Sequence, residues 1–496
     1  MTIPSSPDVV PPEQGARNTR DQALRERHCA AAQPVVAAAF ERLRWPAARL
    51  REERERRLRA LVAHARQHSP WHAARLARID PTRLTEAGLR DLPTMTKHDL
   101  MTNFDEIATD RRLTLQLANR HLAGLGDRDS YLLDAWHAVA TSGATGRRGV
   151  FVYDWDGWME CYATVQRYAL AYALAAGMTP SPQGGFAIAQ VAANQATHMT
   201  YALTETFKSP QFRFHQFPVT LPLAHIVDGL NAARPLVLQG YPSMLGLLAQ
   251  EAAAGRLTIA PRLLIGIGEP LYESTRERLA SVFPDAPVQN WWGCSETSGL
   301  AMSCGAGPGM HLSDDTLIVE LVDEKGAPIA PSQTAAKIFV TNLFNRLTPL
   351  IRYELSDQPT LLDEPCPCGS AHRRVADLQG RHEENFVYDD VRGGQVIVHP
   401  KVFTSVLFSE AGILDYQVWQ TARGAEIDFL PSEAQADAVD VTAAGKRVAR
   451  ALAALGVPAP EVVLKPCGEL DRRHGGKLVR HVPLDHPSAR PHIEFS

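Results

Sequence analysis

Apolar and polar positions follow a helical spacing near the start of the chain. Four apolar residues recur at i, i+3, i+4 and i+7 and therefore share one helix face, namely Leu58, Leu61, Val62 and Ala65. The charged run of residues 51–59 falls on the other faces, where we expect a solvated surface rather than a binding patch. Residues 1–20 contain four prolines and little periodicity, which predicts a flexible arm.

Between about residues 130 and 345, short β-rich runs alternate with helical patterns. The expected strands are residues 235–240, 262–268, 316–322 and 337–343, and the expected helices are residues 244–254 and 272–282. This alternation predicts α/β layering, with a largely parallel sheet in part of the unit.

The pattern after residue 380 indicates a smaller α+β unit. Residues 416–420, 425–430 and 461–465 have strand character, and the first helix that we expect there lies around residues 448–455. Gly456 and Pro458 are typical of residues that end a helix at its C-terminus. We therefore expect a large domain over residues 21–379, a boundary near residues 380–381, and a small domain over residues 380–496.

Composition narrows the class of protein. A chain of 496 residues with 45% hydrophobic and 21% charged residues can bury a sizeable interior and is not a disordered protein. Its net charge of −4 argues against nucleic acid or an anionic membrane as a partner, and no apolar run approaches the ~20 residues needed to span a bilayer. Seven cysteines and a start without a signal-peptide pattern favour a cytoplasmic location.

Four segments could carry chemistry. Residues 141–149 form a Gly/Ser/Thr/Arg turn between two strand-like runs, and backbone N–H groups in such a turn can bind phosphates. The turn lacks the Walker pattern, and taken alone it is more often an ordinary surface loop. Residues 290–299 combine aromatic rings, a glycine and a carboxylate; residues 351–357 end in a carboxylate that could bind a ribose; residues 475–480 present a lysine in a glycine loop.

The order of these segments resembles the adenylate-forming superfamily of acyl-CoA synthetases, adenylation domains and luciferases, and within it the phenylacetate–CoA ligase group. The matching motifs are TSGATG (141–146), GIGEPL (266–271), WWGCSE (291–296), IRYELSD (351–357), GRHEEN (380–385) and GGKLVR (475–480). DLPTMTKHDL (91–100) is similar to the group's N-terminal Leu-Pro-x-x-x-Lys signature. The resemblance runs from about residue 40 to residue 485.

The resemblance implies a mixed α/β fold. A large N-terminal adenylate-forming domain of layered sheets and helices would carry a small, mobile α+β C-terminal domain. It also implies that ATP and Mg²⁺ activate a carboxylic acid, most readily an aryl or arylalkyl acid, as an acyl-adenylate. Coenzyme A would then displace AMP after the small domain rotates. A homodimer stays open as an alternative to a monomer.

Site residues follow from the motifs by resemblance. The residues that would contact the phosphates are Ser142, Gly143, Thr145 and Gly146. The residues that would lie on the adenine side are Gly268, Glu269, Pro270, Asn290, Trp291, Trp292 and Gly293. Ser295 would contact the α-phosphate region, and Glu296 would bind Mg²⁺. Asp357 would bind the ribose diol, and Arg381 would lie at the hinge. Lys477 would bridge carboxylate and phosphate oxygens in the first step, where negative charge develops.

Departures from the motifs leave the acceptor open. Trp292 stands for the usual Tyr, Ser295 for Thr, and Ile397 for an Asn in the turn after the hinge. Relatives that pass the acyl group to a carrier protein or an amine, or that activate nitrite to diazotise an aryl amine, therefore stay as alternatives to transfer to coenzyme A. A third alternative is a non-catalytic nucleotide-binding homologue. Retention of Glu296, Asp357 and Lys477 together argues against it.

The acid pocket is less readable from the sequence. Residues 190–203 and 238–245 mix aromatic, amide and small side chains, which suits a ring-bearing acid but equally suits helix cores. Tyr241, His198 and Gly293 are our candidates for contacts with the acid.

A separate constellation has the composition of a structural zinc site. Cys366 and Cys368 form a Cys-x-Cys pair, and Cys304 and His311 form a Cys-x6-His pair about sixty residues earlier. Three sulfurs and one imidazole suit tetrahedral Zn²⁺ without an open position. Similar residues occur in some phenylacetate–CoA ligase relatives, and the alternative is four unconnected side chains. We expect the remaining cysteines to be inert: Cys29, Cys161, Cys294 and Cys467.

Overall fold

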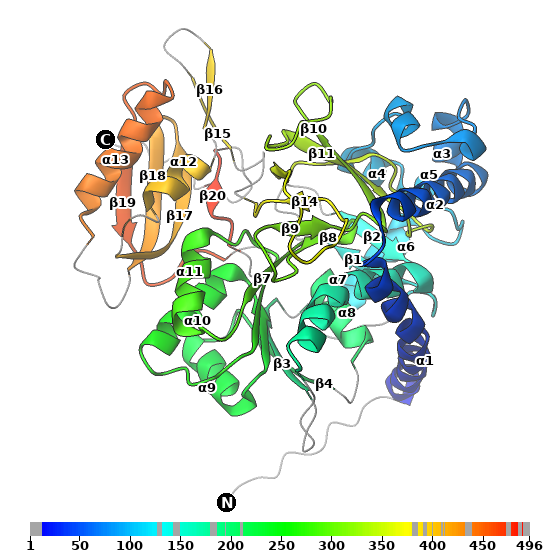
Figure 1. The fold of residues 1–496 in the computed structure, drawn as a ribbon, viewed down its shortest axis with the longest axis horizontal. Helices are drawn as coiled ribbons and strands as arrows, with labels where there is room; N and C mark the ends of the chain where they lie inside the picture. Colours follow the sequence, from blue (N-terminus) through cyan, green and yellow to red (C-terminus); the bar gives the residue numbers. More distant parts are fainter. Residues whose placement is uncertain are drawn as a thin grey trace, which may run out of the picture.

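Figure 1 shows a computed structural model of the chain. The residues that it describes are 12–125, 131–141, 149–178, 186–193, 195–208, 212–378, 385–389, 394–398, 400–407, 410, 412–431, 439–472, 478–484 and 489. None of the helices in these ranges is long and apolar enough to cross a membrane.

The chain begins with a helical region. Its elements are α1 (Pro12–Arg42), α2 (Ala47–His68), α3 (Pro70–Arg75), η1 (Pro81–Arg83), η2 (Ala87–Asp91), α4 (Lys97–Thr102), α5 (Phe104–Ile107) and α6 (Leu115–Gly124). Helix α1 starts at Pro12, so the second part of the expected arm is helical. Proline is well tolerated at the first position of a helix, because its missing N–H has no partner there.

Helix α2 confirms the apolar face and corrects the reading of its charged face. Leu58, Leu61, Val62 and Ala65 are buried, as the spacing predicts. The charged run is not wholly solvated. Arg54 donates to the backbone carbonyl of Asp314 at 2.7 Å, and the side chains of Arg54 and Arg57 are only 12% and 15% exposed. These arginines therefore tie α2 to the rest of the unit.

A nine-stranded sheet forms the centre of the large unit, in the order β13-β14-β9-β8-β7-β6-β5-β3-β4. Its strands are β3 (Phe186–Ala192), β4 (Phe212–Pro218), β5 (Val237–Gly240), β6 (Leu263–Ile267), β7 (Val288–Cys294), β8 (Ser298–Met302), β9 (Met310–Leu312), β13 (Leu361–Leu362) and β14 (Arg374–Val375). From β4 to β7 the pairing is parallel, and from β7 to β13 it is antiparallel. The expected partly parallel sheet is confirmed.

Four helices connect the parallel strands: α8 (Met199–Thr206), α9 (Leu223–Ala233), α10 (Pro242–Ala253) and α11 (Glu273–Val282). Helix α7 (Trp155–Ala175) precedes β3. Two antiparallel sheets complete the large unit. One pairs β1 (His137–Ala140) with β2 (Val150–Tyr153), and the other consists of β10 (Leu317–Val322), β11 (Lys337–Asn342) and β12 (Tyr353–Leu355). The strands and helices expected between residues 235 and 343 are all present.

The C-terminal unit has its own sheet, in the order β19-β18-β17-β20. Its elements are β15 (Phe386–Asp389), β16 (Gln395–Val398), α12 (Lys401–Leu407), β17 (Ile413–Thr421), β18 (Gly424–Pro431), α13 (Val441–Ala454), β19 (Glu461–Pro466) and β20 (His481–Val482). The expected helix is α13, and Gly456 follows it with a φ of +102°. Helix α12 comes first in the unit, contrary to our expectation, because its short, β-branched sequence carries little helical signal.

The small unit has an apolar core built from residues of its own, from Phe386 to Leu464. It also contacts the large unit, where Leu247 of α10 packs against Leu414, Leu430, Leu470 and Leu478. Figure 1 shows the small unit beside α10 and α11 (green). The boundary expected at residues 380–381 lies outside the described residues.

Candidate active site

A cavity of about 280 Å³ lies where the parallel strands of the central sheet end. Residues at or just after the carboxyl ends of β3, β5, β6 and β7 line it, which is where α/β sheets bind their ligands. The residues expected from the sequence that line this cavity are His198, Tyr241, Gly268, Trp291, Trp292, Gly293, Ser295, Glu296 and Asp357. Segments far apart in the chain thus meet in one cavity.

Two buried carboxylates face this cavity from different elements. Glu296 lies in the turn between β7 and β8, and Asp357 lies just after β12; they are 5% and 4% exposed. The hydroxyl of Tyr353 lies 3.4 Å from Oε1 of Glu296, and the side-chain amide of Asn342 donates to the Glu296 carbonyl at 3.0 Å. The turn that carries Glu296 is therefore held from β11 and β12. The carbonyl of Ser295 accepts from the Tyr153 hydroxyl at 2.7 Å.

The phosphate-loop motif starts at the end of a hairpin. Strands β1 and β2 pair antiparallel up to Ala140 and Val150, and Thr141 continues the hairpin with a bond from its amide to the Gly149 carbonyl at 2.9 Å. Thr141 lines the cavity. The residues expected to hold the phosphates lie outside the described residues: Ser142, Gly143, Thr145 and Gly146.

Lys97 is a cavity residue that the sequence reasoning did not place in the site. It is the first residue of α4, which begins with a capping box formed by Thr96 and Asp99. A Cβ on Gly149 would lie 3.0 Å from Cε of Lys97, so the glycine lets the lysine approach the hairpin. The signal that could have found Lys97 is its motif, residues 91–100, whose lysine we noted but assigned no role.

The expected adenine side divides into residues that reach the cavity and residues that do not. Gly268 reaches it with a φ of +74°, and Trp292 of β7 is buried beside it. Gly293 is needed for close packing, because a Cβ there would lie 2.4 Å from the Ser298 carbonyl oxygen. Glu269, Pro270 and Asn290 are not among the residues that line the cavity.

Asn290 and Glu269 instead make contacts behind the cavity wall. The side-chain amide of Asn290 donates to Asp377 at 2.8 Å, just before the expected hinge. Arg276 of α11 also donates to Asp377, at 2.5 Å. The carboxylate of Glu269 turns towards Ser243 and Leu478. Two of the remaining expected site residues, Arg381 and Lys477, lie outside the described residues.

The acid candidates Tyr241 and His198 both line the cavity. The hydroxyl of Tyr241 accepts from the Ala193 amide at 3.3 Å, and burial raises the pKa of this phenol, so it stays neutral. Helices α7 and α8 add lining residues that we did not expect, namely Tyr162, Val165, Gln166, Leu203 and Thr204. Helical periodicity alone does not distinguish such residues from core.

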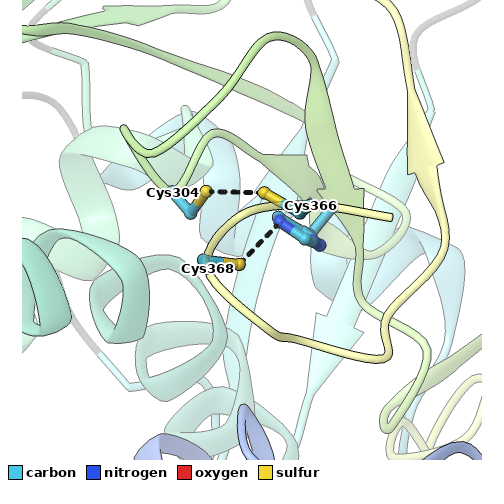
Figure 2. A group of neighbouring side chains, drawn as sticks. Cys304, Cys366 and Cys368 are labelled. Carbon is cyan, nitrogen blue, oxygen red and sulfur yellow. Dashed lines mark hydrogen bonds between the residues drawn. The ribbon is translucent and has the colours of Figure 1, made fainter. Parts of the chain in front are cut away.

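The four expected zinc ligands come together at the antiparallel side of the sheet. Figure 2 shows the three cysteines of this group. Cys304 follows β8, His311 lies on β9, and Cys366 and Cys368 lie between β13 and β14. Their ligand atoms are all within 4.8 Å of one another. Sγ of Cys304 lies 3.5 Å from Sγ of Cys366, and Sγ of Cys368 lies 3.4 Å from Nε2 of His311.

This geometry fits a tetrahedral ion. Zinc–sulfur bonds of about 2.3 Å put the sulfur atoms of a tetrahedron roughly 3.8 Å apart. Nδ1 of His311 lies 3.2 Å from the His372 carbonyl, which can only accept, so Nδ1 carries the proton and Nε2 faces the sulfurs. The hydrogen bond between the two thiols lowers the pKa of Cys304 and raises that of Cys368, so one thiolate of the pair is favoured before any metal binds.

The other cysteines behave as expected of inert thiols. Burial raises the pKa of Cys29, Cys161 and Cys294 and so disfavours the reactive thiolate. Cys467 donates to the Phe429 carbonyl at 3.4 Å.

Comparison with known proteins bears on what this arrangement is. No protein-family model matches the chain. Over 280 residues it is 27% identical to the phenylacetate–coenzyme A ligase of Thermus thermophilus, a match that covers 51% of this chain and only 61% of that relative.

Two solved structures of 2-hydroxyisobutyryl-CoA ligase have the same fold. Its postadenylation state matches with a TM-score of 0.69 at 19% identity, covering 88% of this chain and 90% of that one. Its thioesterification state matches with a TM-score of 0.53 at 21% identity, covering 89% and 91%. The chain therefore has the fold of these acyl-CoA ligases, it is similar in sequence to a phenylacetate–coenzyme A ligase, and residues from several of its motifs line one cavity.

Proposed function

We propose that the chain is an AMP-forming acid ligase, which activates an aryl or arylalkyl carboxylic acid with ATP and passes the acyl group to coenzyme A. The observation that carries this proposal is the single cavity shared by Glu296, Asp357 and the expected acid-binding residues. A binding protein for ATP alone would not need an acid pocket beside a metal-binding carboxylate. The curated relative, a phenylacetate–coenzyme A ligase, supports the same reaction class.

In the first step, a carboxylate oxygen of the acid attacks the α-phosphorus of ATP, and the bond to the β-phosphate breaks to release pyrophosphate. Mg²⁺ would neutralise charge on the phosphate oxygens, and one buried carboxylate together with those oxygens is a typical magnesium environment. Glu296 would supply that carboxylate. Asp357 would accept two hydrogen bonds from the ribose diol, which fixes the nucleotide against the acid.

In the second step, the acceptor's sulfur attacks the acyl carbon and the bond to AMP breaks. Lys477 belongs to the first step, where a mobile cation on the small unit would meet the developing charge. Rotation of the small unit would then remove Lys477 and expose the acyl-adenylate to coenzyme A. The relative positions of the two units are therefore part of the proposed mechanism.

We also propose that Cys304, His311, Cys366 and Cys368 hold a structural zinc ion. Four ligands in a closed set leave no position for a substrate, and none of the four lines the cavity. The ion would join β9 to the loop before β14. That loop leads to Asp377 and so to the segment between the two units.

Pyrophosphate release tests the proposed function. The protein is incubated with ATP, Mg²⁺ and one acid at a time, from a panel of phenylacetate, benzoate and 2-hydroxyisobutyrate. We expect release that depends on the acid and exceeds the no-acid rate, and a thioester once coenzyme A is added. Asp357→Ala should abolish most of the signal, whereas Asp285→Ala, an exposed aspartate away from the cavity, should not.

The outcomes separate the alternatives. Acid-dependent pyrophosphate release without thioester formation would keep adenylation and replace coenzyme A by a carrier protein or an amine. Release with nitrite in place of the acid would indicate nitrite activation. ATP binding without any acid-dependent release would identify a non-catalytic nucleotide-binding homologue.

A further inference from the structure

Glu269 lies at the contact between the large and small units, although its motif would place it beside adenine. It follows the cavity residue Gly268 after the end of β6. Its side chain is only 2% exposed, and both of its carboxylate oxygens are used. Oε1 accepts from the backbone N–H of Leu478 at 2.8 Å, and Oε2 accepts from the hydroxyl of Ser243 at 2.6 Å.

An arginine of the small unit completes this contact. Nη1 of Arg472 lies 3.6 Å from Oε1 of Glu269, and Nη2 of Arg472 donates to the Ser243 hydroxyl at 2.8 Å. Glu269 and Ser243 belong to the large unit, whereas Arg472 and Leu478 belong to the small one. We call these four residues the polar latch. A buried carboxylate that lost Leu478 and Arg472 would keep only Ser243, so the latch favours the arrangement of units seen here.

The polar latch holds Leu478, the residue that directly follows Lys477 in the sequence. The N–H of Leu478 is held by the Glu269 carboxylate, so the small unit is tied to the large unit at this point of the chain. A second contact between the units involves the residues just after Leu478, since the guanidinium of Arg480 lies 4.8 Å from the ring centroid of Tyr272 in the large unit. Arg480 is held in place by Asp415 at 2.7 Å.

The arrangement held by the latch is nearer to one state of a solved ligase than to another. The match to 2-hydroxyisobutyryl-CoA ligase has a TM-score of 0.69 in its postadenylation state and 0.53 in its thioesterification state, at nearly equal coverage. Since the protein compared is the same, the difference reflects how its parts are arranged. The latch therefore belongs to an arrangement that is nearer to the postadenylation state than to the thioesterification state.

We propose that Glu269 is a positioning residue for adenylate formation, which holds the small unit through Leu478 and Arg472 and releases it for the second half-reaction. This inference rests on the proposed function. It assigns Glu269 a role at the contact between the units rather than a contact with adenine.

Separate assays of the two half-reactions test the inference. The variants are Glu269→Ala, Glu269→Gln, Arg472→Ala and the double alanine variant, with Glu277→Ala, an exposed glutamate on α11, as the matched control. We expect Glu269→Ala and Arg472→Ala each to slow acid-dependent pyrophosphate release about tenfold at saturating ATP. The KM for ATP and thioester formation from synthetic phenylacetyl-adenylate and coenzyme A should stay within about twofold. The rate of pyrophosphate release in the double variant should be no lower than in the slower of the two single variants, because both changes break the same contact. Glu269→Gln, which keeps an acceptor for Leu478, should recover part of the rate.

Hydrogen exchange supplies a readout that does not need the reaction. Amides of residues 478–484 should exchange faster in Glu269→Ala and Arg472→Ala than in the parent protein. In Glu277→Ala their exchange rates should equal those of the parent protein. Unchanged exchange in the two latch variants, or equal losses in both half-reactions, would overturn the inference. If no acid supports pyrophosphate release but exchange changes as expected, the proposed function fails while the contact between the units stands.

Discussion

The hydroxyl of Tyr353 lies 3.4 Å from the carboxylate of Glu296 and joins two segments that are 57 residues apart. Tyr353 is on β12, the strand that leads into Asp357, and Glu296 is in the turn after β7. This contact links the turn of the candidate metal ligand to the strand that precedes the candidate ribose ligand. We expect the two carboxylates to act on one nucleotide.

Glu296→Gln should lower the rate of adenylation about 100-fold. The amide keeps the shape of the side chain but removes the charge that would hold Mg²⁺. The measurement is pyrophosphate release over a range of Mg²⁺ concentrations, where the variant should need more metal. Glu324→Gln, at an exposed glutamate, is the control, and an unchanged Mg²⁺ requirement in Glu296→Gln would assign the metal to other ligands.

Asp357→Ala should weaken ATP binding by about 10- to 100-fold, because two charge-assisted hydrogen bonds to the ribose would be lost. Calorimetric titration with ATP measures this directly. If only the KM for the acid changed, Asp357 would have to contact the acid instead of the ribose.

Lys477→Ala should slow adenylation by about 100- to 1000-fold while the protein stays folded and binds ATP. The expectation rests on the motif, since Lys477 lies outside the described residues, and on the cost of removing a cation from a developing negative charge. Lys465→Ala on β19, whose side chain is 50% exposed, is the matched control. Parent-like pyrophosphate release by Lys477→Ala would show that the motif lysine has another role.

Cys366→Ser should lower the zinc content and the thermal stability together. The thiolates gather around one ion in the folded chain, so metal binding contributes to folding. Elemental analysis of protein purified without added metal, followed by thermal unfolding, measures both quantities. Cys467→Ser, at a cysteine outside the group, should change neither. A parent protein with near-zero zinc would mean that the four side chains pack without a metal.

The stability of the fold should fall as the pH drops from 6.5 towards 4. Burial is the main cause that lowers the pKa of His72 to about 4, whereas the pKa in the unfolded chain is about 6.5. Between these values the unfolded chain binds more protons, so acid favours unfolding, by up to about 3 kcal/mol for this group. Nε2 of His72 already lies 3.0 Å from the Pro349 carbonyl, and its buried Nδ1 has no hydrogen-bond partner among the described residues.

Denaturant unfolding at several pH values measures this effect. His72→Gln can still donate to the Pro349 carbonyl but does not titrate, so its stability should depend less steeply on pH. His225→Gln, at an exposed histidine, should keep the slope of the parent protein. Equal slopes in all three proteins would assign the acid sensitivity to other groups.

Local patterns were sufficient for the regular elements. The spacing of Leu58, Leu61, Val62 and Ala65 predicted the buried face of α2, and apolar runs predicted β5, β6, β10 and β11. The Cys and His spacing predicted which four side chains meet. For the helices and strands, neighbours in the sequence carry the information, because the period is complete within a few residues. The two Cys/His pairs lie about sixty residues apart, and the family resemblance supported joining them.

Contacts between distant segments could not be predicted in this way. Arg42 and Arg167 both pair with the buried Asp315, from helices more than a hundred residues away, and nothing near Asp315 in the sequence marks its partners. The hydrogen bond between Glu269 and Leu478 is a second example. The motif of Glu269 predicts a contact with adenine, whereas its observed contacts suggest a role between the two units. Such pairs depend on the packing of whole units.

The most direct test of the central claim is acid-dependent exchange of labelled pyrophosphate into ATP in the absence of coenzyme A. If one cavity binds the acid and ATP and joins them as an enzyme-bound acyl-adenylate, the step is reversible and the label enters ATP only when the right acid is present. We predict exchange with at least one aryl or arylalkyl acid, and its loss in Asp357→Ala and Lys477→Ala. Absence of exchange across the acid panel, in protein that still binds ATP, would contradict the account.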